Sequence, residues 1–185
     1  MRSLIPNSQL PIPNSLTIEE ASKLRICDPA CGSGSFLLGA YRCLLDWHIS
    51  KYIEKPEKYT KGKNPPIYQT KENEYRLTIQ EKKRILLNNI YGVDIDSQAV
   101  EVTKLSLLLK ALEGETDQTL KSLELFHERA LPDLSNNIKC GNSLIGSDFY
   151  DGKETLFDME EQIKVNAFDW EKEFPDVFRE RGIGN

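Results

Sequence analysis

The sequence contains no long hydrophobic run, and no stretch approaches the ~18 apolar residues that a transmembrane helix needs. Residues 1–16 also lack the apolar core of a secretory signal peptide. Both absences argue against a membrane or secreted protein, so we expect a cytoplasmic one without a membrane partner. The 185 residues are 39% hydrophobic and 29% charged, which is typical of a globular chain of one domain.

Closely spaced metal ligands are also missing. The four cysteines form no Cys-x-x-Cys pair, and His48 and His127 show no spacing typical of a zinc site. We therefore expect no metal and interpret both histidines as packing residues. The cysteines are interpreted as reduced and mostly buried, although one of them also belongs to the turn described below. They are Cys27, Cys31, Cys43 and Cys140.

The sequence has no excess of positive charge. Its 24 basic and 29 acidic residues give a net charge of −5. From Asp148 onward there are 11 acidic and 5 basic residues, which leaves 18 acidic and 19 basic residues before that position. Non-specific affinity for DNA comes from Lys and Arg that neutralise phosphates. The even balance predicts that the main surface for any DNA partner lies outside this chain.

The first strong pattern is a strand, a glycine turn and a helix. Residues 24–28 form a short apolar run that ends in an acid, and the segment Pro29-Ala-Cys-Gly-Ser-Gly-Ser35 follows. Apolar positions then recur at spacings of three and four, which is typical of one face of a helix. These positions are Leu37, Ala40, Tyr41, Leu44, Leu45 and His48.

Two more strands and their helices follow. Residues 89–95 predict a buried strand and residues 137–141 a third one, with a short helix expected over residues 80–88. A longer helix, capped by Asp96 or Ser97, is expected to reach Gly114. Its apolar repeat is Val102, Leu105, Leu109 and Leu112. The order of elements predicts an α/β fold, a Rossmann-like parallel sheet with crossover helices.

A polar insertion of about residues 54–79 separates the first helix from the second strand. Residues 67–70 and 75–79 read as the strands of a hairpin. Lysines near Tyr52 and Tyr59 suit either a contact with the DNA backbone or a solvated surface, and the glutamates among them favour the second interpretation. The lysines are Lys51, Lys55, Lys58, Lys61 and Lys63.

Polar residues mark the ends of all three expected strands. Ligands of open parallel sheets bind beyond these carboxyl ends, where Asp28, Asp94 and Asn142 fall. Gly32 and Gly34 allow a tight turn that a ligand can approach closely, and a strand-end carboxylate suits ribose hydroxyls. The pattern predicts a site for an adenosine-type cofactor. Purely structural roles stay open: a glycine turn, a helix cap for Asp94 and a turn residue for Asn142.

Three segments resemble the motifs of DNA adenine-N6 methyltransferases of restriction–modification systems. Asp28-Pro-Ala-Cys-Gly-Ser-Gly-Ser-Phe-Leu37 resembles motif I, and Ile90-Tyr-Gly-Val-Asp94-Ile-Asp96 resembles motif II. Ile138-Lys-Cys-Gly-Asn142-Ser-Leu-Ile145 resembles motif III. The motifs occur in the family's order, and the resemblance extends from about residue 24 to residue 178.

This resemblance implies S-adenosylmethionine as the cofactor. The turn over residues 28–34 would hold the methionine part, with the Asp28 carboxylate near the ammonium group. Asp94 would accept from the ribose hydroxyls, and Ile95 would pack on the adenine ring. Asn142, where many relatives have Asp, would accept from the N6 amine and donate to ring N1. The implied cofactor-binding residues are Asp28, Pro29, Ala30, Cys31, Gly32, Gly34, Asp94, Ile95, Asn142 and Ser143.

The family's catalytic Asn-Pro-Pro-Tyr or Asn-Pro-Pro-Phe motif normally follows motif III. The only Asn-Pro-Pro here is Asn64-Pro65-Pro66, which precedes Ile67 within the insertion, and we interpret it as a stiff turn. Ile183-Gly184-Asn185 resembles the start of the motif. We therefore assign no catalytic residue and expect this chain to be inactive alone, with DNA bound through the full-length protein.

The expected division is an N-terminal segment (1–23), a cofactor-binding domain (24–147) and an acidic extension (148–185). Two alternatives stay open: a non-enzymatic cofactor-binding subunit completed by another chain, or a methyltransferase that acts on RNA or protein glutamine. A nicotinamide-dependent enzyme is disfavoured, because Leu37 replaces the third glycine of its fingerprint. The sequence indicates no oligomeric state. Four aromatic residues of the extension are expected to pack on the body: Phe168, Trp170, Phe174 and Phe178.

The charge balance predicts that this chain alone binds duplex DNA weakly and without sequence preference. An anisotropy titration at physiological salt should show no sequence-selective binding below about 1 μM. A shuffled duplex of the same length and composition is the control. Sub-micromolar binding that distinguishes the two duplexes would contradict the prediction and place a DNA-reading surface within these residues.

Overall fold

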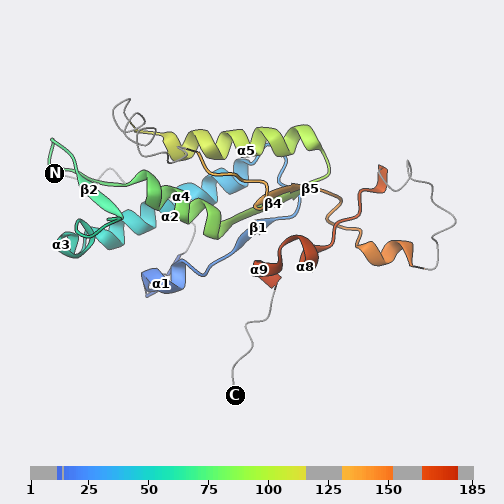
Figure 1. The fold of residues 1–185 in the computed structure, drawn as a ribbon, viewed down its shortest axis with the longest axis horizontal. Coiled ribbons are helices and arrows are strands. Elements are labelled where there is room, and N and C mark those ends of the chain that lie inside the picture. The colour runs from blue at the N-terminus through green and yellow to red at the C-terminus, as the bar shows by residue number, and fades with distance from the viewer. Residues whose placement is uncertain (1–11, 14, 116–130, 152–163, 179–185) are drawn as a thin grey trace, which may run out of the picture.

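The computed structural model describes residues 12–13, 15–115, 131–151 and 164–178, and Figure 1 shows their arrangement. The helices are α1 (Ile18–Ala21), α2 (Ser35–Tyr52), α3 (Pro56–Tyr59), α4 (Ile79–Asn89), α5 (Ser97–Leu112), the 3-10 helix η1 (Ser147–Tyr150), α8 (Trp170–Glu173) and α9 (Pro175–Phe178). The strands are β1 (Ile26–Asp28), β2 (Ile67–Gln69), β3 (Tyr75–Leu77), β4 (Ile90–Asp94) and β5 (Ile138–Cys140).

The main sheet is parallel and has the order β1-β4-β5. Asp28 of β1 lies opposite Gly92 of β4, and Asp94 of β4 lies opposite Cys140 of β5. Parallel neighbours need a crossover connection, and the long helices provide it: α2 and α4 lie between β1 and β4, and α5 follows β4. The predicted Rossmann-like α/β fold is therefore confirmed.

Side chains of the central strand β4 point alternately to the two faces of the sheet. Ile90 belongs to the core beneath α2, α4 and α5, whereas Tyr91 and Val93 belong to a second cluster with Phe168 and Phe174. This alternation follows from the two-residue period of a strand. Because both faces are covered, β4 is nearly all apolar, as buried parallel strands are.

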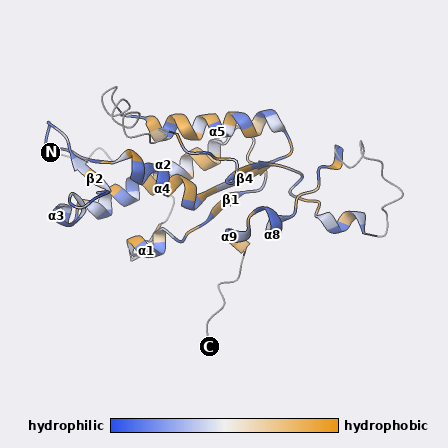
Figure 2. Ribbon diagram, in the orientation of Figure 1, coloured by the Kyte–Doolittle hydropathy of each residue, from blue (hydrophilic) through white to orange (hydrophobic). Residues whose placement is uncertain are grey.

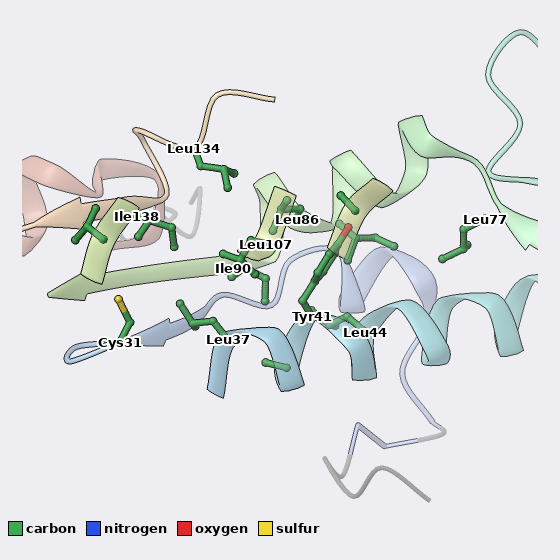
Figure 3. Close-up of a cluster of buried hydrophobic side chains, with 14 of the residues drawn as sticks. Cys31, Leu37, Tyr41, Leu44, Leu77, Leu86, Ile90, Leu107, Leu134 and Ile138 are labelled. Carbon is green, nitrogen blue, oxygen red and sulfur yellow. The ribbon is translucent and has the colours of Figure 1, made fainter. Parts of the chain in front are cut away.

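The larger core lies between the sheet and the three long helices. Figure 3 shows Leu37 and Tyr41 of α2 near Leu107 of α5, with Ile90 of β4 beside them. The predicted apolar face of α2 is confirmed, except that Leu45 is only half-buried. Burial of such side chains stabilises a fold by roughly 1.5–3 kcal/mol each, so this cluster is the main source of stability.

The helix α5 is confirmed, but its apolar repeat does not form its buried face. Val102, Leu105 and Leu109 are 49%, 57% and 59% exposed. The buried residues are instead Val100, Thr103, Leu107 and Ala111. Figure 2 shows apolar residues along most of α5, so the spacing of its leucines fits either side of the helix. The sheet, and not the periodicity, decides which side is buried.

The cysteines and His48 follow the expectations only in part. All four cysteines are free thiols, and Cys31 is buried, but Cys140 at the end of β5 is exposed, which corrects the prediction of mostly buried side chains. His48 is fully buried, and its Nδ1 donates to the carbonyl of Leu44 at 2.8 Å. Burial lowers the pKa of His48, so it packs as a neutral ring. His127 lies outside the described residues.

The predicted hairpin is confirmed as the antiparallel pair β2 and β3. The short helix α3 precedes it in the polar insertion, where only the hairpin was expected, and Pro56 at its first position favours this helical turn. The ring of Tyr59 in α3 packs against that of Tyr52 in α2, with ring centroids 4.7 Å apart and the rings tilted by 57°. The insertion is therefore anchored to the C-terminal end of α2.

The aromatic residues of the C-terminal region pack on the second face of the sheet. Phe168 and Phe174 are buried, and Trp170 donates its indole N–H to the carbonyl of Ser143 at 3.1 Å. Phe178 remains 45% exposed but lies against Trp170. The expectation that these residues pack on the body is confirmed.

Two general features concern only the described part of the chain. None of its helices combines the length and apolar character required to cross a membrane. Within the same residues, no three His, Cys, Asp or Glu side chains are grouped in a way that would hold a metal ion. The expected resemblance at Ile183–Asn185 lies outside the described residues, as does most of the N-terminal segment.

Packing of the C-terminal region depends on the missing side chain of Gly141. A Cβ there would lie 2.4 Å from Cδ2 of Phe168, so Gly141→Ala must displace the ring. We expect the free energy of unfolding to fall by roughly 1–3 kcal/mol, which is typical of overpacking. Urea denaturation followed by tryptophan fluorescence measures the change.

Gly39→Ala is the matched control, because a Cβ at Gly39 in α2 meets no atom within 4 Å. Alanine favours a helix interior by about 1 kcal/mol over glycine, so this variant should be more stable than the wild type. Equal stability of Gly141→Ala and the wild type would show that Phe168 does not pack on β5 in solution.

Candidate functional site

The carboxyl ends of the three parallel strands bring the expected site residues to one edge of the sheet. β1 ends in Asp28, β4 ends in Asp94, and Asn142 follows β5 by two positions. The backbone N–H of Gly141 donates to the carbonyl of Asp94 at 2.9 Å, which holds the ends of β4 and β5 together. The edge is therefore built from all three segments that resemble family motifs.

The turn after β1 depends on two glycines with positive φ. Gly32 has φ +52° and Gly34 has φ +80°, values that residues other than glycine rarely adopt. The turn closes by a bond from the N–H of Gly34 to the carbonyl of Cys31 at 2.8 Å, and Ala30 donates to Oδ1 of Asp28 at 3.1 Å. Gly34 is also the N-cap of α2, and without a side chain it leaves the first amide groups of that helix open as donors.

The two glycines have different surroundings. A Cβ on Gly34 would lie 2.8 Å from the methyl carbon of Thr103, so this position is closed from behind. A Cβ on Gly32 would meet no atom within 4 Å, so this position faces open space. The turn therefore rests on α5 through Gly34 and presents Gly32 to a ligand.

Asp94 connects the turn to the neighbouring strand. Its Oδ2 accepts from the N–H of Gly32 at 2.8 Å, and its Oδ1 accepts from the N–H of Asp96 at 2.9 Å. The helix cap is Asp96, whose carboxylate accepts from the N–H of Gln98 at 2.8 Å. The alternative that Asp94 caps this helix is therefore wrong, and Asp94 fixes the positions of motifs I and II relative to each other.

The residues after β4 and β5 complete the edge. Ile95 is 57% exposed, so its side chain is open to a ligand. Oδ1 of Asn142 accepts from the N–H of Leu144 at 3.2 Å, which is the bond of a turn residue. The backbone N–H of Asn142 donates to the carbonyl of Asn166 at 2.6 Å. The turn role that the sequence left open for Asn142 is present, and it leaves the amide nitrogen of the side chain as a further donor.

The two cysteines near the turn have thiols with raised pKa values. Burial raises the pKa of the Cys27 thiol to about 11, and it raises the pKa of the Cys31 thiol to about 11 as well. Nearby carboxylates contribute to the increase in both. Thiols with such pKa values stay protonated at neutral pH and behave as small apolar side chains.

Thr103 is the residue of this site that the sequence did not reveal. It is fully buried on α5, and its hydroxyl donates to the carbonyl of Gly32 at 2.8 Å. The residues that bond are 71 positions apart, so no local motif contains them both. The only available signal was a polar residue at helical spacing among apolar ones.

Asn64-Pro65-Pro66 lies apart from this edge. Thr78 donates its backbone N–H to the carbonyl of Pro66 at 2.9 Å and its hydroxyl to the carbonyl of Pro65 at 3.0 Å. The same Thr78 caps α4. In Figure 1, the hairpin that follows these prolines lies near the C-terminal end of α2. The carboxyl ends of the parallel strands lie near the other end of that helix. The segment therefore serves as the expected stiff turn.

Comparison with known proteins supports the resemblance. Residues 15–154 match the family described as MmeI, DNA-methyltransferase domain. The chain belongs to this DNA-methyltransferase family. Its α/β sheet and the order of its three motifs agree with that membership.

Three relatives carry names consistent with this family. A Methanocaldococcus jannaschii protein whose name describes a type II restriction enzyme and methyltransferase is 40% identical over 129 residues, which cover 70% of this chain and 9% of the relative. The Escherichia coli type II restriction enzyme and methyltransferase RM.Eco57I is 35% identical over 145 residues, which cover 78% of this chain and 13% of the relative.

The third relative is the adenine-specific methyltransferase PglX of Streptomyces coelicolor, 26% identical over 157 residues. That match covers 85% of this chain and 11% of the relative. The DNA-methyltransferase region described here thus spans between 9% and 13% of the length of these curated relatives.

Proposed function

We propose that this chain is the S-adenosylmethionine-binding part of a DNA methyltransferase that modifies N6 of adenine in a restriction–modification or related defence system. The observation that carries the proposal is the glycine turn held by Asp94 at the edge where three parallel strands end. Family membership and the names of the relatives support the reaction class. We further propose that the cofactor domain spans residues 24–147, with an insertion at about 54–79, between an N-terminal segment (1–23) and an acidic extension (148–185).

The residues at this edge fit such a cofactor. The side of Gly32 that faces open space forms a cradle that a Cβ would fill, so a ligand atom can approach the backbone there. The open amides at the start of α2 suit the carboxylate of an amino acid. The edge then presents the carboxylate of Asp94, the exposed side chain of Ile95 and the amide of Asn142. This order suits a ribose followed by an adenine ring.

Each residue then has one role in holding the cofactor. The Asp28 carboxylate binds the ammonium group, and residues 29–34 enclose the methionine part. Asp94 accepts from the ribose hydroxyls through lone pairs that its two backbone bonds leave free. Ile95 packs on the adenine ring, and the side chain of Asn142 and the neighbouring Ser143 bind the edge of that ring. The bound cofactor supplies an activated methyl group on a sulfonium, and these residues hold it in one orientation for in-line transfer.

Transfer to DNA requires groups that we place outside residues 12–178. The prolines at 65 and 66 use their carbonyls to hold Thr78 and lie away from the strand ends, so they do not suit the amine of a target adenine. The charge balance supports the same division, because the sequence has no excess of basic residues. DNA is therefore bound by the full-length protein.

The proposal predicts that the isolated chain binds S-adenosylmethionine in a calorimetric titration. Asp94→Ala should weaken binding by roughly 1–3 kcal/mol, because the hydroxyls and the N–H of Gly32 lose an acceptor. Asp96→Ala is the matched control: it removes only the cap of α5, so it should lower stability by about 1 kcal/mol and leave the affinity nearly unchanged.

No heat from the folded wild-type chain at millimolar cofactor would refute the proposed function. Far-UV circular dichroism of the same sample establishes that the chain is folded. Equal losses of affinity in Asp94→Ala and Asp96→Ala would place the ribose contact elsewhere.

The position of Asn64 generates a separate prediction. In the full-length protein, Asn64→Ala should leave transfer of labelled methyl groups to DNA within about twofold of the wild type, because the residue lies away from the strand ends. The matched control is the Asn of the family's Asn-Pro-Pro motif that follows motif III, whose loss should lower the rate by orders of magnitude. Abolished transfer in Asn64→Ala with unchanged cofactor affinity would make the insertion catalytic.

A further inference from the structure

The strongest unexplained feature near the turn is Thr103. It is the single polar residue among the buried positions of α5, whose other members are Val100, Leu107 and Ala111. A hydroxyl inside a helix commonly bonds to the carbonyl four residues earlier in its own helix. Thr103 instead donates across to the carbonyl of Gly32 at 2.8 Å. Thr103 thus occupies a buried position among apolar residues, and its hydroxyl bonds to the turn after β1 and not to α5 itself.

The peptide groups on both sides of Gly32 are held by residues distant in sequence. Its N–H donates to Asp94 at 2.8 Å, and its carbonyl accepts from Thr103 at 2.8 Å. The methyl carbon of Thr103 also closes the space behind Gly34, where a Cβ would lie 2.8 Å away. Thr103 therefore supports both glycines of the turn. Its hydroxyl bonds to the carbonyl of Gly32, and its methyl group fills the space behind Gly34.

The bonds to Gly32 are important because glycine has access to more backbone conformations than any other residue. Gly32 reaches negative and positive φ with similar ease, so an unsupported turn would sample many conformations. A ligand that binds a mobile turn must order it, and that cost reduces the affinity. A turn that is ordered before the ligand arrives avoids the loss.

We propose that Thr103 is a positioning residue that orders the glycine turn in advance of cofactor binding. The proposal rests on the proposed function of this turn as the S-adenosylmethionine site. We place Thr103 outside the cofactor contacts, because it bonds to the turn from α5, whereas a Cβ on the open side of Gly32 would meet no atom within 4 Å. It acts through the orientation of the two peptide groups of Gly32.

Two substitutions separate the hydroxyl from the rest of the side chain. Thr103→Val keeps the branched shape and removes the donor, and it should raise the Kd for S-adenosylmethionine about tenfold. Thr103→Ser keeps the donor and removes the methyl group, and its Kd should stay within about threefold of the wild type. Leu107→Val is the matched control on the same face of α5, and it should lower the thermal stability without changing the Kd.

A second measurement needs no cofactor. Hydrogen exchange of the backbone amides of Gly32 and Gly34 should be faster in Thr103→Val than in the wild type and unchanged in Leu107→Val. Only a role in ordering the turn predicts this difference between two substitutions on one helix face.

The outcomes distinguish the inference from the proposed function. Absence of binding by the wild type refutes the proposed function, and this inference with it. Binding by the wild type and Thr103→Val with equal Kd overturns the inference alone. Equal weakening in Thr103→Ser and Thr103→Val, or in Leu107→Val, also overturns it, because the effect would then come from packing and not from the hydroxyl.

Discussion

The hydrogen bond between Asp94 and the N–H of Gly32 is the contact on which the site depends. It joins the turn after β1 to the end of β4, the two parallel strands of one crossover unit, across 62 positions of sequence. Parallel strands bring their carboxyl ends to one edge, but the loops beyond them remain free to move independently. A carboxylate that also accepts from the N–H of Asp96 fixes both loops at once. The ribose contact proposed for Asp94 therefore uses a side chain that is already immobilised.

Local patterns predicted the strands and the three long helices, but they did not predict which side of every helix is buried. The spacing of Leu37, Tyr41 and Leu44 identified the buried side of α2. α5 is apolar on two sides, so its periodicity favoured Val102 and Leu105, which the structure exposes. Which side is buried depends on where the sheet lies, and that is information from the tertiary structure.

The site was predictable where its residues are consecutive in sequence. The turn from Asp28 to Gly34 and the strand end at Asp94 follow rules of strand, turn and helix that a single segment displays. Thr103 contributes through a bond to a residue 71 positions away, and nothing in its own segment distinguishes it from a residue that bonds within the helix. Contacts of this kind arise only when the chain has folded, so the sequence reveals the residues of the turn better than the distant residue that supports it.

The end of β5, in motif III, is also held by residues distant in sequence, which belong to the C-terminal region. Asn142 donates its N–H to the carbonyl of Asn166, and Ser143 accepts from the indole of Trp170 at 3.1 Å. Phe168 lies against the bare backbone of Gly141, just before them. Residues 164–178 thus hold the end of β5 as Asp94 and Thr103 hold the end of β1. The acidic extension was expected to pack on the body through its aromatic residues, and this aromatic part also holds one of the three strand ends. The ends of β1 and β5 at this edge of the sheet are therefore both held by segments that come later in the chain.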